Sequence, residues 1–348
     1  MSVPTKQTVS IAYGRLESQV SGLFFKDKGI IDNAFGANPT IKWLRDAAMR
    51  KPLGGGERIY FPVRLTKRGG EASYSDLDNI SITRPDNKTV GQVQTKEYGR
   101  AVTISRRDED LIRGERAIAD LMVTEMEDAL TTIVDDLDSD CFGDGTANSS
   151  KVVGGLPLWV PVDPTDSAVT PAGINQNANT NWRSQIGDNN DTAANVLADL
   201  RTLLTLCKSG NRGPSHGVCN RTFRNVLLAD FTDTFQHNPV ITRGAVQPLT
   251  GKSGDPAIGT LFYQGIPIVE DEDAALTGGG NAYCWFLDPS TFVIVDATRG
   301  QKRADLIEWM PLHELDQQTA KVGFMRGHLA IFCVERRRNG LFFDGPSS

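Results

Sequence analysis

The 348-residue sequence has few of the residues on which metal and redox sites depend. Its four histidines lie at no spacing typical of metal ligands, which argues against a zinc site. Its five cysteines are odd in number, and no two of them form a CxxC pair. Scattered cysteines of this kind are typical of small buried side chains in a reducing cytoplasm. We therefore predict no structural metal and no cofactor. The cysteines are Cys141, Cys207, Cys219, Cys284 and Cys333.

Long apolar runs are also missing. No segment approaches the roughly 20 apolar residues needed to span a membrane, and residues 1–10 lack the apolar core of a secretory signal. The net charge of −6 argues against tight generic binding of nucleic acid, which needs many Lys and Arg. The apolar fraction of 39% is ordinary for a soluble protein, and the length allows about two domains with their own cores.

A long polar ribbon is the first distinctive feature. After three glycines at 54–56, apolar and polar residues alternate over 59–65, which predicts an edge strand interrupted by Pro62. A second strand pattern runs over 89–105, and the polar residues 66–88 form the tip. Two arms of about 15–20 residues project on the order of 50 Å. Because an isolated two-stranded ribbon is marginal in water, we expect it to have no support within its own chain and to lie on a neighbouring subunit.

A long acidic helix follows the ribbon directly. Asp108, Glu109 and Asp110 suit the first turn of a helix, and apolar residues then recur every three or four positions up to Cys141. The helix spans roughly 45 Å, and glycines at 143 and 145 end it. It lacks the sustained heptads of a coiled coil, so a helix along one side of a sheet is favoured. The order of ribbon, helix and Gly-Gly-Leu loop indicates a protein that tiles with copies of itself.

The remaining segments alternate between helix and strand patterns. We predict helices at 39–50, 196–207 and 221–229, and strands at 217–220, 260–269, 282–287 and 292–295. Residues 149–190 are predicted to be rich in loops. Strands at 307–312, 319–326 and 328–335 are predicted to return to the first half of the chain.

Charge is spread unevenly along the chain. Residues 1–51 hold eight basic and four acidic residues, whereas residues 108–144 hold thirteen acidic and two basic ones. The basic arm of one copy could attract the acidic helix of another. The alternative is that the acids form a solvated face that keeps the protein soluble.

Two fragments imitate catalytic motifs without their context. Gly251-Lys252-Ser253 resembles the end of a phosphate-binding loop, but Val246 stands where that loop needs a glycine. Residues 213–217 spell a nucleophile elbow around Ser215, yet the predicted helix precedes them and the strand follows, which is the reverse of an elbow. We therefore interpret both fragments as loops or turns.

Two acidic clusters suggest cation binding. Asp136, Asp138 and Asp140 have the spacing of a calcium loop, but the required glycine and final glutamate are absent and the apolar stripe keeps them on the helix. The run Glu270-Asp271-Glu272-Asp273 favours a solvated turn. The alternative is a metal-dependent hydrolase that uses Asp271 or Asp273. His216, His237, His313 and His328 offer it no partner at a recognisable spacing.

Six segments, in this order, resemble the major capsid proteins of tailed bacteriophages. The first is the ribbon with its helix, and the other five are VGGLPLW at 153–159, VDPT at 162–165, NWRSQ at 181–185, GTLFYQGIPIVEDED at 259–273 and YCWFLD at 283–288. The resemblance implies an α+β fold with an N-terminal arm, an extended E-loop hairpin, a P-domain with a long spine helix, and an A-domain. It places the arm at 1–53, the E-loop at 54–106 and the P-domain at 107–190. The A-domain then covers 191–302, and 303–348 are return strands of the P-domain.

The same resemblance implies a structural, non-enzymatic role. Copies would assemble into pentamers and hexamers of an icosahedral head shell that encloses the phage genome, built in the host bacterial cytoplasm and carried in the virion. Each E-loop would lie over a neighbour, where its basic residues could pair with acids of the spine or A-domain. No long helical N-terminal extension is seen, which indicates a separate scaffolding protein, and a portal and a decoration protein are further expected partners. Packaged double-stranded DNA would be held weakly and non-specifically. The alternative is an encapsulin-type nanocompartment shell. The basic residues are Arg64, Lys67, Arg68, Arg84 and Lys88.

Overall fold

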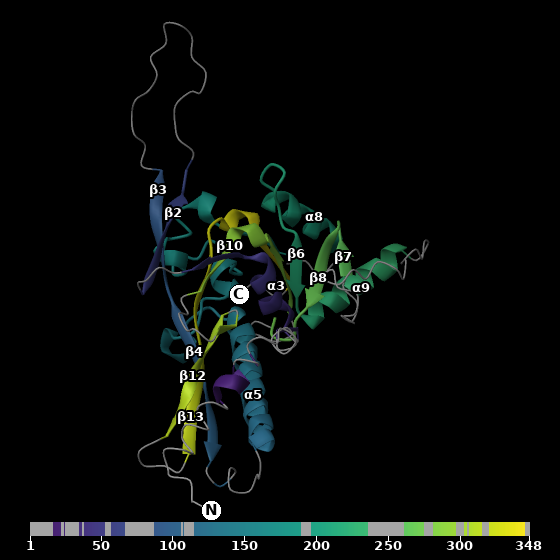
Figure 1. Cartoon of the computed structure of the whole chain (residues 1–348). Coiled ribbons are helices and arrows are strands. Elements are labelled where there is room, and N and C mark those ends of the chain that lie inside the picture. The colour runs from purple at the N-terminus through teal and green to yellow at the C-terminus, as the bar shows by residue number, and fades with distance from the viewer. Residues whose placement is uncertain are drawn as a thin grey trace, which may run out of the picture. The chain divides into compact units, whose positions relative to one another are not determined.

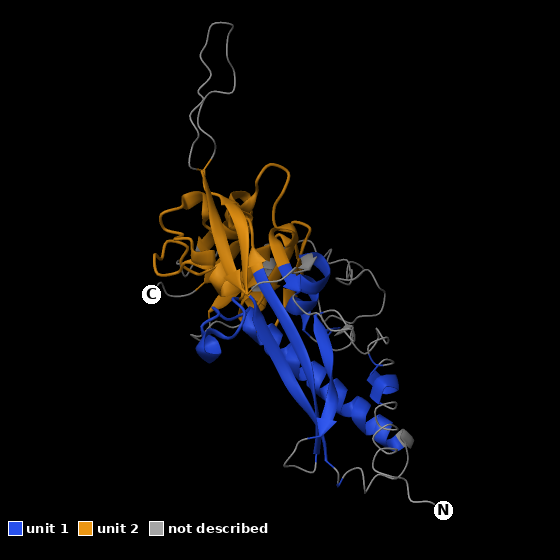
Figure 2. Cartoon of the chain, turned by 60° about the vertical axis from the view of Figure 1, so that its left-hand side comes forward, with its two compact units in different colours: residues 1–55, 95–154, 294–331 blue, residues 56–94, 155–293, 332–348 orange. Residues whose placement is uncertain are grey.

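The computed structural model divides the chain into two compact units, each made of three separate segments (Figure 2). Unit 1 comprises residues 1–55, 95–154 and 294–331, and unit 2 comprises residues 56–94, 155–293 and 332–348. The structure describes residues 17–21, 24, 35–36, 38–52, 57–66, 87–105, 107, 115–188, 196–235, 261–274, 281–296, 303–304, 306–314 and 320–344. Both helices and strands are abundant in these residues, as the predicted α+β class requires.

The first sheet has the order β1-β10-β13-β12-β11, and β4 also pairs with β13. The β4–β13 ladder is antiparallel and runs from Lys96↔Leu329 to Ser105↔Ala320. Alternate residues of β4, including Val102 and Ile104, are buried. The strands are β1 (Met49–Pro52), β4 (Lys96–Ser105), β10 (Phe292–Asp296), β11 (Arg303–Ala304), β12 (Ile307–Glu314) and β13 (Ala320–Cys333).

Helix α5 (Glu115–Cys141) packs along β4 in unit 1. Its 27 residues span about 40 Å. The predicted apolar stripe is buried from Met122 to Cys141, which confirms a helix that covers one side of a sheet. The predicted end at Cys141 is confirmed, and the left-handed turn that follows it lies at Gly145. The predicted first turn at 108–110 lies outside the described residues.

Two short helices complete the described part of unit 1, and a third lies in unit 2. α3 (Pro39–Ala47) confirms the helix predicted at 39–50, three residues shorter. α6 (Ala147–Ser150) is an irregular turn in which Asn148, Ser149 and Ser150 have φ values of 48°, 58° and 60°. α7 (Leu156–Trp159) falls within the Gly-Gly-Leu segment and lies at the start of the second segment of unit 2.

The second sheet lies in unit 2 and has the order β5-β14-β9-β6-β8-β7. Helices α8 (Val196–Cys207) and α9 (Arg221–Phe235) confirm two predicted helices, and α9 extends six residues further. Both pack on one face of this sheet around Cys284, Phe286 and Phe342. The strands are β5 (Gln185–Asp188), β6 (His216–Cys219), β7 (Leu261–Tyr263), β8 (Ile266–Glu270), β9 (Ala282–Leu287) and β14 (Gly340–Asp344). Short 3-10 turns lie at Pro171–Gly173, Thr180–Trp182, Pro289–Thr291 and Arg336–Arg338.

Four predicted strands are wrong in their extent. The strand predicted at 89–105 is two strands, β3 (Lys88–Gln94) and β4, because the partner changes at Thr95 from β2 to β13. The strand predicted at 260–269 is the hairpin β7–β8, which turns through positive φ at Gln264 and Gly265. The strands predicted at 319–326 and 328–335 are one strand, β13, because Gly327 keeps its partners on both sides.

Four strands were not predicted, namely β1, β5, β11 and β14. β5 lies in the segment predicted as loops, and it pairs in parallel with β14 near the end of the chain. The described chain after β13 does not pair with the strands of unit 1. Its last strand, β14, belongs to the sheet of unit 2. The predicted five-part division into arm, E-loop, P-domain, A-domain and return strands stays a prediction.

Candidate assembly surfaces

The base of the ribbon is a two-stranded sheet formed by β2 (Arg58–Arg64) and β3 (Figure 1). One face of it packs on unit 2 itself. Phe61 is 7% exposed and stacks on Phe332 with ring centroids 4.5 Å apart. Opposite Phe61 stands Gly91, where a Cβ atom would lie 2.8 Å from the Phe61 ring and 3.2 Å from Ala172. Only glycine fits here, so this close approach fixes how the hairpin leaves the unit.

The expectation that the ribbon has no support within its own chain is therefore wrong for residues 57–66 and 87–94. Their buried face includes Phe61 and Val63, and Asn181 Nδ2 donates to the Leu65 carbonyl over 2.9 Å. The expectation fails because each strand has only one apolar face, and unit 2 of the same chain supplies the surface that covers it. Of the predicted tip at 66–88, residues 67–86 lie outside the described residues.

The opposite face of the hairpin, here called the outer hairpin face, lacks such cover in the described chain. Tyr60 is 64% exposed and Val90 is 61% exposed, although burial of either side chain would be favourable. Arg64 stands directly opposite Lys88, and like charges in this position destabilise a strand pair. The outer hairpin face thus combines exposed apolar surface with positive charge. It consists of Arg58, Tyr60, Pro62, Arg64, Lys88, Val90, Gln92 and Gln94.

Two of the five basic residues predicted for subunit pairing lie on this face. They are Arg64 and Lys88, and both are exposed. Lys67, Arg68 and Arg84 lie outside the described residues. The Arg64 Nε donates to the Thr66 carbonyl over 3.1 Å.

Acids crowd the C-terminal end of α5, where the helix dipole disfavours negative charge and the last turn contains no basic residue. Donors from other elements of unit 1 offset this conflict. Asp138 is 1% exposed and accepts from the Ile41 N–H over 2.8 Å. Asp135 accepts from Asn38 Nδ2 over 2.6 Å. The Asp138 carboxylate thereby caps the first turn of α3, whose own N-cap residue, Asn38, makes no capping bond and instead donates its side-chain amide to Asp135.

Tyr98 and Arg100 of β4 hold the next two acids. Tyr98 Oη donates to Asp140 Oδ2 over 2.7 Å, and Arg100 pairs with Asp136. Burial raises the pKa of Asp140, and the Tyr98 hydrogen bond counters part of that rise. Asp136, Asp138 and Asp140 therefore engage three different donors on two elements, so they do not converge on one cation. Among the described residues, no group of three or more acids, histidines or cysteines could hold a metal ion.

A second row of polar residues on α5 faces solvent. Its members recur every three or four positions, so they form one stripe along the helix. Three of them are acids, and no basic residue interrupts the stripe. We call it the exposed spine stripe. It consists of Asp120, Thr124, Asp128, Thr131, Asp135 and Ser139.

The acidic run at 270–273 is divided between different partners. Glu270 pairs with Arg224 of α9. Asp271 is 3% exposed, and its N–H donates to the Cys219 carbonyl over 3.0 Å. Glu272 and Asp273 face solvent. The arrangement is a strand end tied to α9, and it leaves Asp271 no open approach for a substrate.

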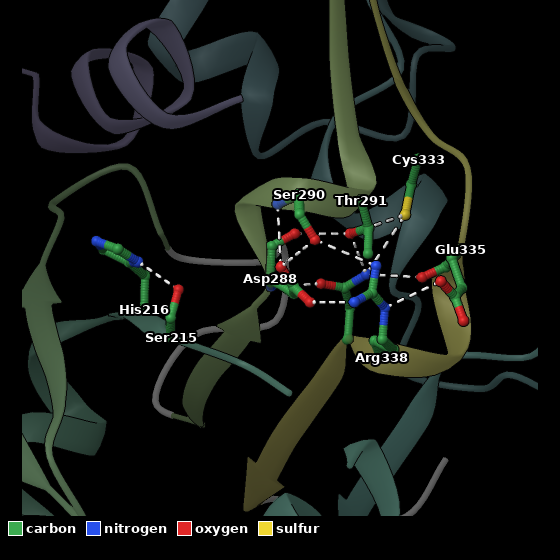
Figure 3. A network of polar contacts seen from close by, with 9 residues as sticks. Ser215, His216, Asp288, Ser290, Thr291, Cys333, Glu335 and Arg338 are labelled. Atoms are coloured by element: carbon green, nitrogen blue, oxygen red, sulfur yellow. Dashed lines mark hydrogen bonds and ion pairs between the residues drawn. The ribbon is translucent and has the colours of Figure 1, made fainter. Parts of the chain in front are cut away.

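The Ser215–His216 pair is the nearest approach to a catalytic arrangement in the described chain. The Ser215 Oγ and His216 Nδ1 atoms lie 2.9 Å apart, and burial lowers the pKa of His216 (Figure 3). Ser215 precedes β6 instead of following a strand, which confirms that this fragment is a turn. Gly251-Lys252-Ser253 and His237 lie outside the described residues. His313 contacts the Phe324 ring at 6.0 Å, and His328 lies in β13.

Sequence reasoning missed a polar network around residues 335–339. Arg338 pairs with Asp288 over 2.9 Å and with Glu335 over 3.0 Å (Figure 3). Asn339 donates to Thr291 Oγ1 and to the Glu335 carbonyl. The run Arg336-Arg337-Arg338 gave no signal of this network, because three arginines in a row are typical of an exposed surface, yet Arg336 and Arg338 are buried.

Arg336 is the most deeply buried charge of that turn. Its Nε donates to the Trp159 carbonyl over 2.6 Å, and a terminal nitrogen donates to Gln176 Oε1 over 2.8 Å. The guanidinium lies 5.6 Å from the centroid of Trp182. Burial lowers the pKa of Arg336 to about 10. One arginine thus joins the Gly-Gly-Leu segment and the Asn-Trp-Arg segment within unit 2.

The chain is similar to known proteins in both sequence and structure. Residues 89–330, more than half of the chain, match the family model described as phage capsid protein. No curated protein matches the sequence. Among solved structures, the chain is similar to the capsid of a native GTA particle, with a TM-score of 0.57 and 13% identity over 87% of this chain and 89% of that one.

Two further structures extend the likeness. The SrpI encapsulin of Synechococcus elongatus PCC 7942 has a TM-score of 0.55 and 11% identity over 86% of each chain. Mycobacterium phage Bobi has a TM-score of 0.50 and 13% identity over 87% of this chain and 90% of that one. At such identities the structures show the fold alone, and the family match is to phage capsid protein. The predicted fold class and resemblance are confirmed. The chain belongs to the phage capsid protein family.

Proposed function

We propose that this chain is the major head protein of a phage, and that its copies form the pentamers and hexamers of an icosahedral shell around the genome. The family match and the shared fold support a major capsid protein. The single observation that supports tiling most directly is the outer hairpin face, where Tyr60 and Val90 are mostly exposed beside Arg64 and Lys88. In a shell of repeated subunits, a second copy of the chain would cover this face.

The outer hairpin face is suited to an acidic surface with apolar edges. A carboxylate placed between Arg64 and Lys88 would remove their mutual repulsion. The exposed spine stripe of another copy has the required charge, with Asp120 and Asp128 eight residues apart on the same side of the helix. A single exposed ion pair contributes about 0–1 kcal/mol. Repetition around a closed shell, together with burial of Tyr60 and Val90, makes the sum large.

The wider role follows from the same proposal. The protein is structural and not an enzyme, and it resides in the virion after assembly in the host cytoplasm. A scaffolding protein and a portal act during assembly, and a decoration protein can bind the finished shell. The net charge of −6 suits an inner wall that holds double-stranded DNA weakly. No described helix has the length and apolar character required to cross a membrane.

The fold also supports an encapsulin-type shell as a second candidate, because the SrpI encapsulin has one of the higher TM-scores. The two candidates differ in cargo. Particles that copurify with nuclease-protected DNA, in cells that also supply portal and packaging proteins, favour the phage head. Particles that retain a host protein through a short peptide favour the nanocompartment.

Electron microscopy of the purified chain tests the proposal. We expect capsomers or closed shells from the unmodified protein. The double variant Arg64→Glu with Lys88→Glu should remain unassembled, whereas Arg64→Lys, which keeps the charge, should assemble. Circular dichroism shows whether each variant is folded. Self-assembly would be refuted if the unmodified chain stayed monomeric at every protein and salt concentration, with or without scaffolding protein.

A further inference from the structure

Two buried cysteines face each other across neighbouring strands of unit 2. In the antiparallel β6–β9 ladder, Cys219 is the direct partner of Cys284. Both side chains are fully buried and belong to the same apolar core under α8 and α9, so they lie on the same face of the sheet. Both are free thiols.

The hydrogen bonds show which kind of pair this is. The Cys219 carbonyl accepts from the Asp271 N–H, on the β8 side of the strand. The next residue, Asn220, donates its N–H to the Tyr283 carbonyl over 3.1 Å, on the β9 side. Backbone groups alternate between the two sides of a strand, so Cys219 and Cys284 form a non-hydrogen-bonded pair. In such a pair the Cα atoms lie about 4.5 Å apart, within the range of roughly 4.4–6.8 Å that a disulfide spans.

Asn220 fixes the register at this point. Its Oδ1 accepts from the Tyr283 N–H over 3.0 Å and also from the Phe223 N–H over 3.0 Å. Its Nδ2 donates to the Asn281 carbonyl over 2.7 Å. One side chain thus joins the end of β6, the start of β9 and the first turn of α9. A slip of β6 against β9 that would separate the two sulfurs would break the bonds of Asn220 to the Tyr283 N–H and to the Asn281 carbonyl.

We propose that Cys219 and Cys284 form an intrachain disulfide by exchange with a small-molecule disulfide. The thiolate of one cysteine attacks a sulfur of the small disulfide and releases one small thiol. The second cysteine then attacks the protein sulfur of the mixed disulfide and releases the other small thiol. The two cysteine protons pass to the released thiols, so two protein thiols are oxidised and one small disulfide is reduced.

The closed core makes this reaction slow. Burial raises the pKa of Cys219 to about 12 and raises that of Cys284 well above its ordinary value, so little thiolate exists in the folded state. The exchange therefore proceeds while β6 and β9 open locally or while the chain folds. Once formed, the bond closes residues 220–283 into a loop that contains α9, β7 and β8.

The consequence for a particle rests on the proposed function. A shell built in a reducing cytoplasm meets an oxidising medium after the host cell lyses. The cross-strand bond would then fasten unit 2 of every subunit without joining one subunit to another. The chemistry itself belongs to the single chain, so it can be tested whether or not the chain assembles.

Peptide mapping tests the pair directly. The full chain is refolded, or held at a urea concentration just below its unfolding transition, in mixtures of oxidised and reduced glutathione. After alkylation under denaturing, non-reducing conditions, we expect one peptide joined through Cys219 and Cys284. Cys141, Cys207 and Cys333 should be alkylated. Oxidation should raise the Tm of the chain by about 5–10 °C.

Matched variants control for burial and folding. Cys207→Ala removes another buried cysteine of the same core and should keep the bond and the Tm rise. Cys219→Ala and Cys284→Ala should each abolish both. The proposal is overturned if Cys219 and Cys284 are alkylated after refolding under oxidising conditions. It is equally overturned if either cysteine pairs with Cys207 instead. Neither result depends on shell formation, which microscopy measures separately.

Discussion

Tyr98 donates its hydroxyl proton to Asp140 over 2.7 Å and accepts from the Val153 N–H over 3.0 Å. One phenol therefore joins β4, the last turn of α5 and the loop that follows. Burial is the main cause of a strongly raised pKa at Tyr98, so the hydroxyl remains a donor throughout the ordinary pH range. The junction fixes the end of the long helix relative to the strand beneath it.

Removing this hydroxyl should weaken unit 1. Tyr98→Phe leaves the Asp140 carboxylate and the Val153 N–H without that partner, which costs about 1–3 kcal/mol. Urea unfolding at pH 7 measures the loss. As a control, Tyr60→Phe on the outer hairpin face should change the free energy of unfolding by less than about 0.5 kcal/mol. Equal effects at the two positions would contradict the role given to Tyr98.

The pH dependence of this junction has a definite sign. Because the pKa of Asp140 is raised in the folded chain, folding favours its protonated form. Its contribution to stability is fully present below the unfolded pKa and is lost as pH rises through the folded pKa. The free energy of unfolding of Asp140→Asn, measured relative to that of the unmodified chain, should therefore be higher at pH 7 than at pH 3. Thermal unfolding at the two pH values measures this difference, and a reversed order would contradict it.

The buried carboxylate of Asp138 should also be important for α3. Asp138→Ala removes the acceptor of the Ile41 N–H inside the core, for a cost of about 1–3 kcal/mol. Ser139→Ala, one residue along and exposed, should be nearly neutral. Hydrogen exchange of the Ile41 amide reports the loss locally. An unchanged exchange rate in Asp138→Ala would show that another group satisfies this amide.

Arg336 offers a test of the junction within unit 2. Arg336→Lys keeps the charge but cannot reach both the Trp159 carbonyl and Gln176, so we expect a loss of about 3 kcal/mol. Arg337→Lys, at the exposed position of the same turn, should lose less than about 0.5 kcal/mol. Denaturant unfolding compares the two variants. A loss at Arg337 as large as that at Arg336 would contradict the junction.

Much of the fold follows from local pattern. The apolar stripe and the two glycines predicted where α5 ends, and the clear periodicity of 196–207 predicted α8. What local pattern could not show is a change of partner. The alternation of β3 continues into β4, so nothing in the side chains marks Thr95 as the place where one sheet ends and another begins. The parallel pairing of β5 with β14 joins residues more than 150 positions apart, and neither strand is long enough to be recognised alone.

The candidate surfaces were predictable to a similar degree. Arg64 and Lys88 were expected on the ribbon, and the structure places them opposite each other. The facing of Cys219 and Cys284 depends on the register of two strands, which composition and spacing do not determine. The burial of Arg336 was likewise hidden, because a run of three arginines is typical of an exposed surface.

Oxidative footprinting of Tyr60 tests the central claim most directly. The ring is 64% exposed in the single chain. If another copy covers the outer hairpin face, hydroxyl-radical labelling of Tyr60 and Val90 should fall several-fold in assembled particles relative to dissociated subunits of the same preparation. Closed shells in which both residues are labelled as strongly as in the free subunit would contradict the account.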